Sequence, residues 1–198
     1  MTADPASTTQ GGLYTGHRMR VQPSTRQMTQ LQASSKVAPL GAIFEVVEDF
    51  SAGLTPGSRL IGIDLGTKTI GLALSDVTRT IATPLETIRR VKFTPDVARL
   101  LAITAEHGVA GLVLGLPVNM DGSEGPRAQA TRAFARNLNK LSALPILLWD
   151  ERLSTSAAER TLIEADTSRK RRAEVIDKMA AGIILQGALD RMRHRAAD

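Results

Sequence analysis

The sequence contains no cysteine and no long apolar run. Without cysteine, neither a disulfide framework nor a thiolate metal site can form, and folding does not depend on an oxidising compartment. The apolar stretches all fall short of the roughly 20 residues that a membrane-spanning helix needs. The N-terminus also lacks the charged stretch, apolar core and cleavage site of a secretory signal. These absences favour a cytoplasmic protein with no membrane partner.

Histidine is scarce too, with three residues that are far apart in the chain. His17 lies in a polar tail, His107 at the end of a predicted helix and His194 near the C-terminus. A zinc site or an acid–base centre built on histidine needs such side chains to gather, so their placement argues against both. The remaining candidates for a chemical site are carboxylates.

The residues that are present have the balance of a globular protein with excess positive charge. Hydrophobic residues make up 42% and charged residues 23%, and the formal net charge is +5. Residues 1–58 hold four basic and four acidic side chains, so the excess belongs to residues 59–198, where 21 Lys and Arg face 16 Asp and Glu. That part of the chain is therefore compatible with a polyanionic partner.

The composition changes near residue 58. Residues 1–40 are rich in Ser, Thr, Gln, Gly and Ala and have few large apolar side chains, which predicts a mostly disordered extension over residues 1–58. Within it, residues 42–50 are apolar enough for one or two helical turns that dock on the rest of the protein. Residues 59–195 have the usual length of one folded domain.

Hydrophobic patterning predicts the elements of that domain in the order βββαβαβα with one extra helix. The predicted strands are 60–65, 69–75, 85–90, 111–116 and 145–149, and the predicted helices are 94–107, 126–141, 155–164 and 172–193. The first two strands form a hairpin around Gly66-Thr67-Lys68. A meander followed by alternating α and β units predicts an α/β fold with a five-stranded mixed sheet flanked by helices.

Asp64 lies on the first predicted strand, within the segment IGIDLGTKTIG. Ile63 and Leu65 point to the opposite face of that strand, whereas the face of Asp64 holds Gly62 and Gly66. A carboxylate between glycines can be approached closely by backbone, by a cation and by a substrate phosphate. The alternative is a strand-end aspartate that accepts hydrogen bonds in a turn.

A second acid is expected at the end of the fifth predicted strand, where Trp149 is followed by Asp150 and Glu151. In a sheet with parallel strands, ligands collect beyond the carboxyl ends of those strands. Adjacent side chains on a strand point to opposite faces, so one of the two acids is expected to join Asp64. Glu151 is the preferred candidate because its longer side chain can reach back, and Asp150 is the alternative.

A third acid, Asp177, lies on the last predicted helix beside Ala180, Ala181 and Ile184 at helical spacing. This small apolar face should pack on the sheet, where an unpaired carboxylate is costly, so a cation or a strong hydrogen-bond partner is expected. The alternative is an ion pair with a distant arginine. Three such carboxylates would suit Mg²⁺ or Mn²⁺, which prefer carboxylate and water oxygens and accept substrate phosphate as a further ligand.

Several linked blocks resemble the YqgF/RuvX family, described as Holliday junction resolvases and as pre-16S rRNA nucleases. These blocks are GIDLGTKTIGLALSD at 62–76, GLPVNMDGSEGPRA at 115–128, WDERLST at 149–155 and VIDKMAAGIILQ at 175–186. The resemblance implies a ribonuclease-H-like fold, which the order of elements fits. It also implies a hydrolase that cleaves phosphodiesters of structured nucleic acid with a divalent metal. The implied catalytic and metal-binding residues are Asp64, Glu151 and Asp177, with Asp150 as a further candidate ligand.

On this interpretation, phosphates would be bound by polar side chains beside the acids, namely Lys68, Asn119, Arg127 and Arg152. The run RKRR at 169–172 opens the final helix against the helix dipole, which suggests either an external polyanion or a solvated cluster. Aromatic residues make up 3% of the chain, which favours recognition of backbone and shape over base stacking.

The resemblance leaves precursor rRNA and branched DNA open as partners. Resolving a junction needs two sites on opposed strands and hence a homodimer, whereas one subunit suffices to trim RNA. A non-catalytic RNA-binding assembly factor with the same fold is an alternative. An actin-like or sugar-kinase-like nucleotide-binding protein also begins with an Asp-x-Gly-Thr motif, but the chain is too short for the two domains that such proteins close around nucleotide.

Overall fold

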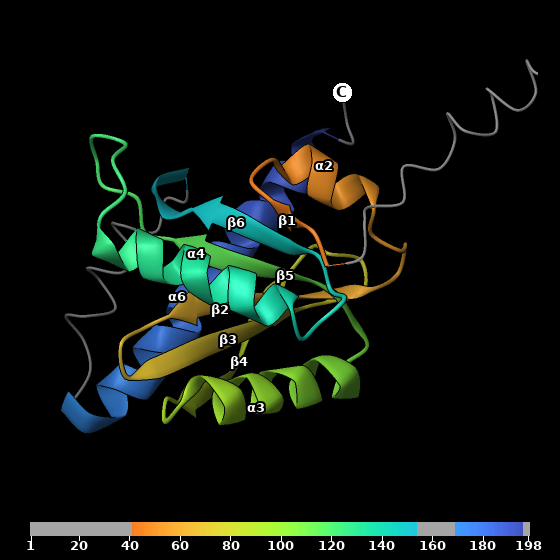
Figure 1. Cartoon of the computed structure of the whole chain (residues 1–198). Coiled ribbons are helices and arrows are strands. Elements are labelled where there is room, and N and C mark those ends of the chain that lie inside the picture. Colours follow the sequence, from red (N-terminus) through yellow and green to blue (C-terminus); the bar gives the residue numbers. More distant parts are fainter. Residues whose placement is uncertain (1–40, 154–168, 196–198) are drawn as a thin grey trace, which may run out of the picture. The chain divides into compact units, whose positions relative to one another are not determined.

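The computed structural model describes residues 41–153 and 169–195, with the side chains of the last helix described from Asp177 to His194. Eleven elements follow one another in these two ranges (Figure 1). They are β1 (Ile43–Phe44), α2 (Val47–Ala52), β2 (Arg59–Leu65), β3 (Thr69–Ser75), β4 (Ala82–Arg89), α3 (Phe93–Glu106), β5 (Val109–Leu116), α4 (Pro126–Asn139), β6 (Ile146–Asp150), the short 3-10 helix η1 (Glu151–Leu153) and α6 (Arg169–Arg195).

The strands form one mixed sheet in the order β1-β6-β5-β2-β3-β4. Strands β2, β3 and β4 pair antiparallel as a meander, while β2, β5, β6 and β1 pair in parallel. The predicted α/β fold, with an antiparallel side and a parallel side, is confirmed. All five predicted strands are present, although β4 begins at Ala82, three residues earlier than expected.

The prediction of five strands is wrong by one, because the sheet has a sixth strand at its edge. Strand β1 contains two residues, and Ile43 and Phe44 pair with Ile146 and Leu147 of β6. Two residues are too few to show an alternating pattern, so only the pairing with β6 identifies them as a strand. The sequence predicted only helical turns within residues 42–50. The structure has a strand there as well as the start of α2.

Helix α2 and the residues on either side of it pack on the sheet. Phe50 of α2 is fully buried, and its ring lies 5.9 Å from that of Phe44 in an edge-on arrangement. Val47 and Leu54 join the same apolar cluster as Trp149. The predicted disorder of residues 1–40 and the predicted helix 155–164 fall outside the described residues.

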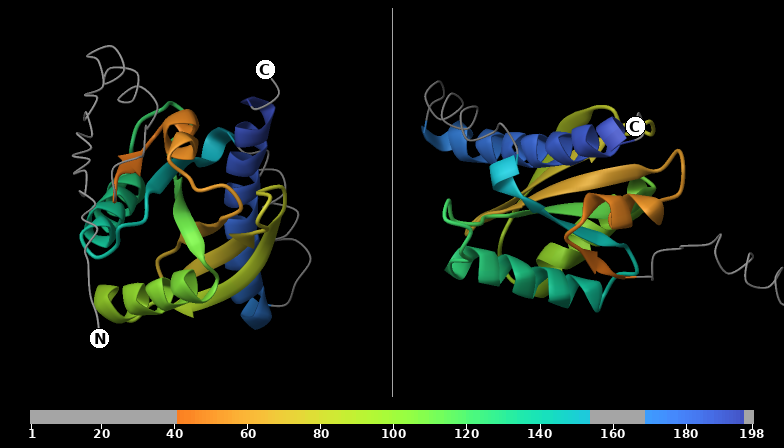
Figure 2. Two further views of the ribbon diagram at one scale, coloured as in Figure 1. Left: turned by 90° about the vertical axis from the view of Figure 1, so that its right-hand side faces the viewer. Right: turned by 90° about the horizontal axis from the view of Figure 1, so that it is seen from above.

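Helices cover both faces of the sheet, as the right-hand view of Figure 2 shows. One apolar cluster fills the space between the sheet and helices α3 and α4, with Ile61, Ile63 and Phe134 among its buried members. A second cluster lies between the opposite face and helices α2 and α6, where Ile184 and Leu185 are buried. Within the described ranges, no helix combines the length and the apolarity needed to cross a bilayer.

Helix α6 is the element that positions the candidate site. It runs through 27 residues and contacts β3, β4, β2 and β5. Its sheet-facing stripe is small and apolar, as predicted, with Ala180, Ala181 and Ile184 each at most 2% exposed. The predicted start at residue 172 is three residues late, since the helix begins at Arg169.

Candidate active site

Strands β2, β4, β5 and β6 run in the same direction, so their carboxyl ends share one edge of the sheet. From β6 towards β4, this edge carries η1, the loop 117–125, the hairpin 66–68 and the segment that leads into α3 (Figure 1). Every residue that the sequence nominated for the site, apart from Asp177, lies on one of these strand ends or loops or on the first turn of α4. Asp177 approaches from α6.

Asp64 lies one residue before the end of β2, on the face covered by α6. The face follows from Gly62, two residues earlier, where a Cβ atom would lie only 2.6 Å from Cβ of Leu185 on α6. Ile63 belongs to the cluster on the opposite face, as the alternation predicts. Asp64 is 8% exposed, so it is a buried carboxylate that α6 partly covers.

Gly71 brings Asp177 close to Asp64. Gly71 pairs directly with Asp64 across the β2–β3 ladder. A Cβ atom on Gly71 would lie 2.0 Å from the carbonyl oxygen of Asp177, so only glycine allows α6 to pack this closely on β3. The Thr69 hydroxyl, two residues before Gly71, donates a hydrogen bond of 2.5 Å to the carboxylate of Asp177. Asp177 thus has the strong hydrogen-bond partner that its position requires.

Glu151 reaches the same face of the sheet from η1. Its Oε1 atom lies 2.7 Å from where a Cβ atom of Gly115 would be, and Ile184 of α6 borders the same spot. Gly115 follows Leu114, which pairs with Ile63 of β2, so the next position of the ladder lies beside Asp64. A second glycine therefore makes room for the Glu151 carboxylate next to the strand that carries Asp64.

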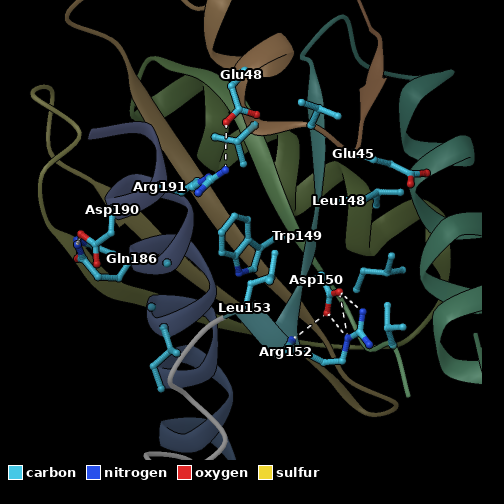
Figure 3. Close-up of a pocket in the computed structure, with 18 of the residues that line it drawn as sticks. Glu45, Glu48, Leu148, Trp149, Asp150, Arg152, Leu153, Gln186, Asp190 and Arg191 are labelled. Atoms are coloured by element: carbon cyan, nitrogen blue, oxygen red, sulfur yellow. Dashed lines mark hydrogen bonds and ion pairs between the residues drawn. The ribbon is translucent and has the colours of Figure 1, made fainter. Parts of the chain in front are cut away.

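Asp150 occupies a different environment, because it forms an ion pair with Arg152. The guanidinium donates from Nη2 to Oδ2 at 2.7 Å, and the backbone N–H of Arg152 donates to Oδ1 at 2.9 Å (Figure 3). These hydrogen bonds lower the pKa of Asp150, and the carboxylate in turn raises the pKa of Arg152. Asp150 pairs with Leu116 in the ladder, whereas Trp149 pairs with Gly115, so the two adjacent residues have opposite orientations.

Three carboxylates thus come to one face of the sheet from three elements, but they do not form a closed ligand set. Among the described residues, no group of three or more histidine, aspartate or glutamate side chains lies close enough to hold a metal by itself. The Asp177 carboxylate is turned to Thr69. Any cation bound at this face would therefore need ligands from water or substrate besides those of the protein.

A groove of about 1460 Å³ lies beside these acids rather than around them. It is lined by residues of α2, β6, η1 and α6 and of the loop 117–125 (Figure 3). Of the nominated site residues, Asp150 and Arg152 line this groove, whereas Asp64, Glu151 and Asp177 do not. The groove alone would not have identified the three acids.

The four nominated phosphate-binding residues surround the acids without meeting at one point. Lys68 is exposed in the hairpin after Asp64. The Asn119 side chain donates to the Ser123 hydroxyl at 2.9 Å, and the backbone carbonyl of Asn119 accepts a hydrogen bond of 3.4 Å from Arg152. Arg127 is exposed on the first turn of α4. Lys68 thus lies on one side of Asp64, and the other three lie on the side of β5 and β6.

Sequence reasoning missed an ion pair that fixes the end of the loop 117–125 next to α4. Arg132 of α4 contacts Glu124 at 2.6 Å and Glu45 at 2.5 Å, and its hydrogen bonds lower the pKa of Glu124. Thr69 was also missed, although it stands five residues after Asp64 at the start of the next strand. The only signal for Thr69 in the sequence is the alternation of side chains along a strand, which places Thr69 on the same face of β3 as Gly71.

Comparison with known proteins identifies the family. Residues 58–191 match the family model described as "RuvX: Holliday junction resolvase". Proteins named "Putative pre-16S rRNA nuclease" from Cereibacter sphaeroides and Rhodobacter capsulatus are 71% identical over 150 residues and 68% identical over 148 residues. These matches cover 76% and 75% of this chain and 94% and 93% of the two relatives.

Among solved structures, Thermus thermophilus RuvC in complex with a Holliday junction substrate has a TM-score of 0.44 at 13% identity, covering 68% of this chain and 96% of that one. The ribonuclease-H-like α/β class predicted from the sequence agrees with the sheet topology and with the family. The family match extends over most of the folded part of the chain, and the curated relatives are matched over nearly their full length. The chain belongs to the RuvX family of nucleases.

Proposed function

We propose that this protein is a divalent-metal-dependent nuclease that hydrolyses phosphodiesters of structured nucleic acid in the maturation of pre-16S rRNA. The observation that carries the proposal is the placement of Asp64, Glu151 and Asp177. The three acids lie on one face of the sheet, at the edge where its parallel strands end. Gly71 lets the α6 backbone at Asp177 lie against β3, and Gly115 leaves the room on β5 that the Glu151 carboxylate occupies.

The residues present fit a hard cation. The donors are three carboxylates, which Mg²⁺ and Mn²⁺ prefer, and no cysteine exists that would favour a softer metal. The place that a Cβ atom would take at Gly115 holds the Glu151 carboxylate, on the strand next to the one that carries Asp64. When bound, such an ion supplies charge neutralisation at the phosphate and lowers the pKa of a water molecule.

The remaining work falls to side chains of this chain. Thr69 fixes the orientation of the Asp177 carboxylate through its hydroxyl. Arg152, held by Asp150, places a cation beside the loop 117–125, where Asn119 and Arg127 would bind further phosphates. Lys68 would bind the nucleic acid on the other side of Asp64. No covalent nucleophile is required from the protein.

The substrate is inferred from the relatives. Two proteins about 70% identical over most of this chain carry the name of a pre-16S rRNA nuclease, which supports ribosome biogenesis in the cytoplasm as the setting. The description of the family model favours a second candidate, resolution of Holliday junctions in DNA. That activity would need a homodimer with two opposed sites.

Cleavage assays test the proposal directly. Labelled precursor rRNA and a labelled four-way DNA junction are incubated with the protein and Mg²⁺, Mn²⁺ or a chelator, alongside Asp64→Asn and the control Asp49→Asn. Asp49 is exposed on α2, away from the acids. We expect metal-dependent cleavage by wild type and by Asp49→Asn, and a loss of at least 100-fold in Asp64→Asn, the order of magnitude for losing one group that stabilises a transition state.

Equal cleavage by wild type and Asp64→Asn would show that the acids are not the site. The absence of cleavage with both substrates would instead favour a non-catalytic RNA-binding role. Sequencing of rRNA ends after depletion of the protein separates the two substrates, because unprocessed 16S ends are expected only if the RNA is the physiological one. Light scattering with and without the junction tests the dimer that resolution demands.

A further inference from the structure

Beside Lys68, the carboxyl edge of the sheet carries two further cations, Arg90 and Lys92, that the proposed mechanism does not use. Arg90 and Lys92 follow β4, and both are exposed. Lys68 lies beside them, because the backbone N–H of Arg90 donates to the carbonyl of Lys68 at 2.9 Å. We call Lys68, Arg90 and Lys92 the basic strip. Within the described part of the chain, none of the three forms an ion pair with an acid.

Arg90 connects this strip to the candidate site. Its Nη1 atom donates a hydrogen bond of 2.7 Å to the carbonyl of Gly66, two residues after Asp64. A guanidinium has five N–H donors, so most of them stay available to a ligand while one holds the hairpin. The bond therefore keeps a cation at the end of the strand that carries the buried Asp64.

Lys92 stands where the helix dipole disfavours it. It is the N-cap residue of α3, a helix of 14 residues, and its side chain makes no capping hydrogen bond. Positive charge at a helix N-terminus is destabilising, whereas a bound anion there is favourable. Helix α6 also begins with basic residues, RKRR at 169–172, and has no acid in its first turn. Helix α3 carries one acid, Asp96, in its first turn, so the feature that the two helices share is a basic residue at their start. A bound polyanion would stabilise that positive charge.

From these observations we infer that the basic strip binds the phosphate backbone of the nucleic acid on the β4 side of the acids. This inference rests on the proposed nuclease function and extends it by giving the direction of the bound strand. The path would run from Arg152 beyond β6, past Asp64, to Lys92 beyond β4. The strand order β6-β5-β2-β3-β4 gives this path four inter-strand spacings.

The length of this path gives a footprint. Four spacings of about 4.8 Å make roughly 19 Å. At a rise of about 3.4 Å per nucleotide, that distance corresponds to about five or six nucleotides of one strand. The strip would contact phosphates in a manner independent of base identity, in agreement with the small number of aromatic residues in the chain.

The test measures binding rather than cleavage. Fluorescence anisotropy follows a fluorescein-labelled RNA stem with single-stranded tails, with Ca²⁺ in place of Mg²⁺ to slow hydrolysis, over a range of salt concentrations. The variants are Lys68→Gln with Lys92→Gln, and Lys140→Gln as the matched control. Lys140 is exposed after α4, at the opposite edge of the sheet. The side chains of Lys68 and Lys92 accept and donate no hydrogen bond among the described residues, so the double variant should fold.

For single strands, a plot of the logarithm of the binding constant against the logarithm of the salt concentration has a slope of about −0.7 for each phosphate contact. The double variant removes two contacts, so its slope should be shallower than that of wild type by about 1.4. If wild type and the double variant bind equally at about 1 M salt, this difference in slope makes the double variant bind about 25-fold more weakly at 0.1 M salt. The loss should be the same for RNAs of different sequence, and Lys140→Gln should bind like wild type.

Other outcomes separate the two hypotheses. If wild type binds and cleaves but the double variant keeps the wild-type slope, the basic strip is refuted and the nuclease function stands. If cleavage falls while affinity and slope are unchanged, the strip is refuted as a phosphate-binding surface. If wild type binds neither this RNA nor a DNA junction, the proposed function fails, and the strip fails with it.

Discussion

Replacing Gly71 by alanine should force β3 and α6 apart. The added Cβ atom would lie 2.0 Å from the carbonyl oxygen of Asp177 and 2.9 Å from the backbone nitrogen of Lys178, and ordinary contact begins at 3.4 Å. The neighbours are main-chain atoms of a helix, so no side chain can turn away. Moving the carbonyl oxygen from 2.0 Å to 3.4 Å requires a separation of about 1.4 Å.

This separation affects stability and activity by different routes. Overpacking of this kind typically costs about 1–3 kcal/mol, and the helix that must move packs Ala181, Ile184 and Leu185 on the sheet. For a chain of this size, 2 kcal/mol corresponds to about 4–8 °C in the melting temperature. Activity should fall further than stability, because a misplacement of about 1 Å at a reacting centre can cost on the order of 100-fold.

Urea denaturation and the cleavage assay measure the two effects, with Gly182→Ala as the matched control on α6. A Cβ atom at Gly182 would meet only side-chain atoms of Pro84, the nearest at 3.6 Å. Because alanine is the better helix former, this control should equal wild type or gain up to about 1 kcal/mol. Wild-type stability and activity in Gly71→Ala would refute the close approach of Asp177 to the strand beside Asp64.

Three further predictions concern other parts of the molecule. Thr69→Val should raise the Mg²⁺ concentration needed for half-maximal cleavage by about 10–100-fold, the usual effect of losing a group that orients a metal ligand, while Thr69→Ser stays near wild type. Phe50→Ala should destabilise the protein by about 3–5 kcal/mol in urea, whereas Val46→Ala, at a half-exposed position of the same segment, should change stability by less than about 0.5 kcal/mol. Hydrogen bonds from Ile81 and Thr78 hold the pKa of Asp76 well below its ordinary value of 3.8. The charged carboxylate therefore stabilises the fold above that pH, and this stability is lost progressively as the pH falls below it. Asp76→Ala should therefore be less stable at neutral pH, and the difference from wild type should shrink as denaturation is followed below pH 4; a constant difference would contradict this.

The sequence predicted the elements around the site well because their signals are local. The alternation around Asp64 placed it on the face opposite Ile63, and helical spacing placed Asp177 on the stripe of Ala180 and Ile184. Both patterns follow from the periods of strand and helix, which short segments already display. The preference for Glu151 over Asp150 stays a prediction. The ion pair with Arg152 favours Glu151, because it already engages the carboxylate of Asp150.

Other features depend on partners far away in the chain and could not be predicted. Strand β1 exists because Ile43 and Phe44 pair with β6, about 100 residues later. The hydrogen bond between Thr69 and Asp177 joins residues 108 positions apart. Arg132 links Glu124 to Glu45, and no periodicity marks any of these three as partners.

The sequence by itself determined the class of fold, the family and the types of residue available for chemistry, since these follow from local patterning and from blocks of adjacent residues. Only the tertiary structure decided how closely the acids approach one another. That approach depends on the packing of α6 against β3 and β5, which Gly71 and Gly115 permit. A glycine does not show in the sequence which backbone will lie against it, because that contact forms only when the helix closes over the sheet.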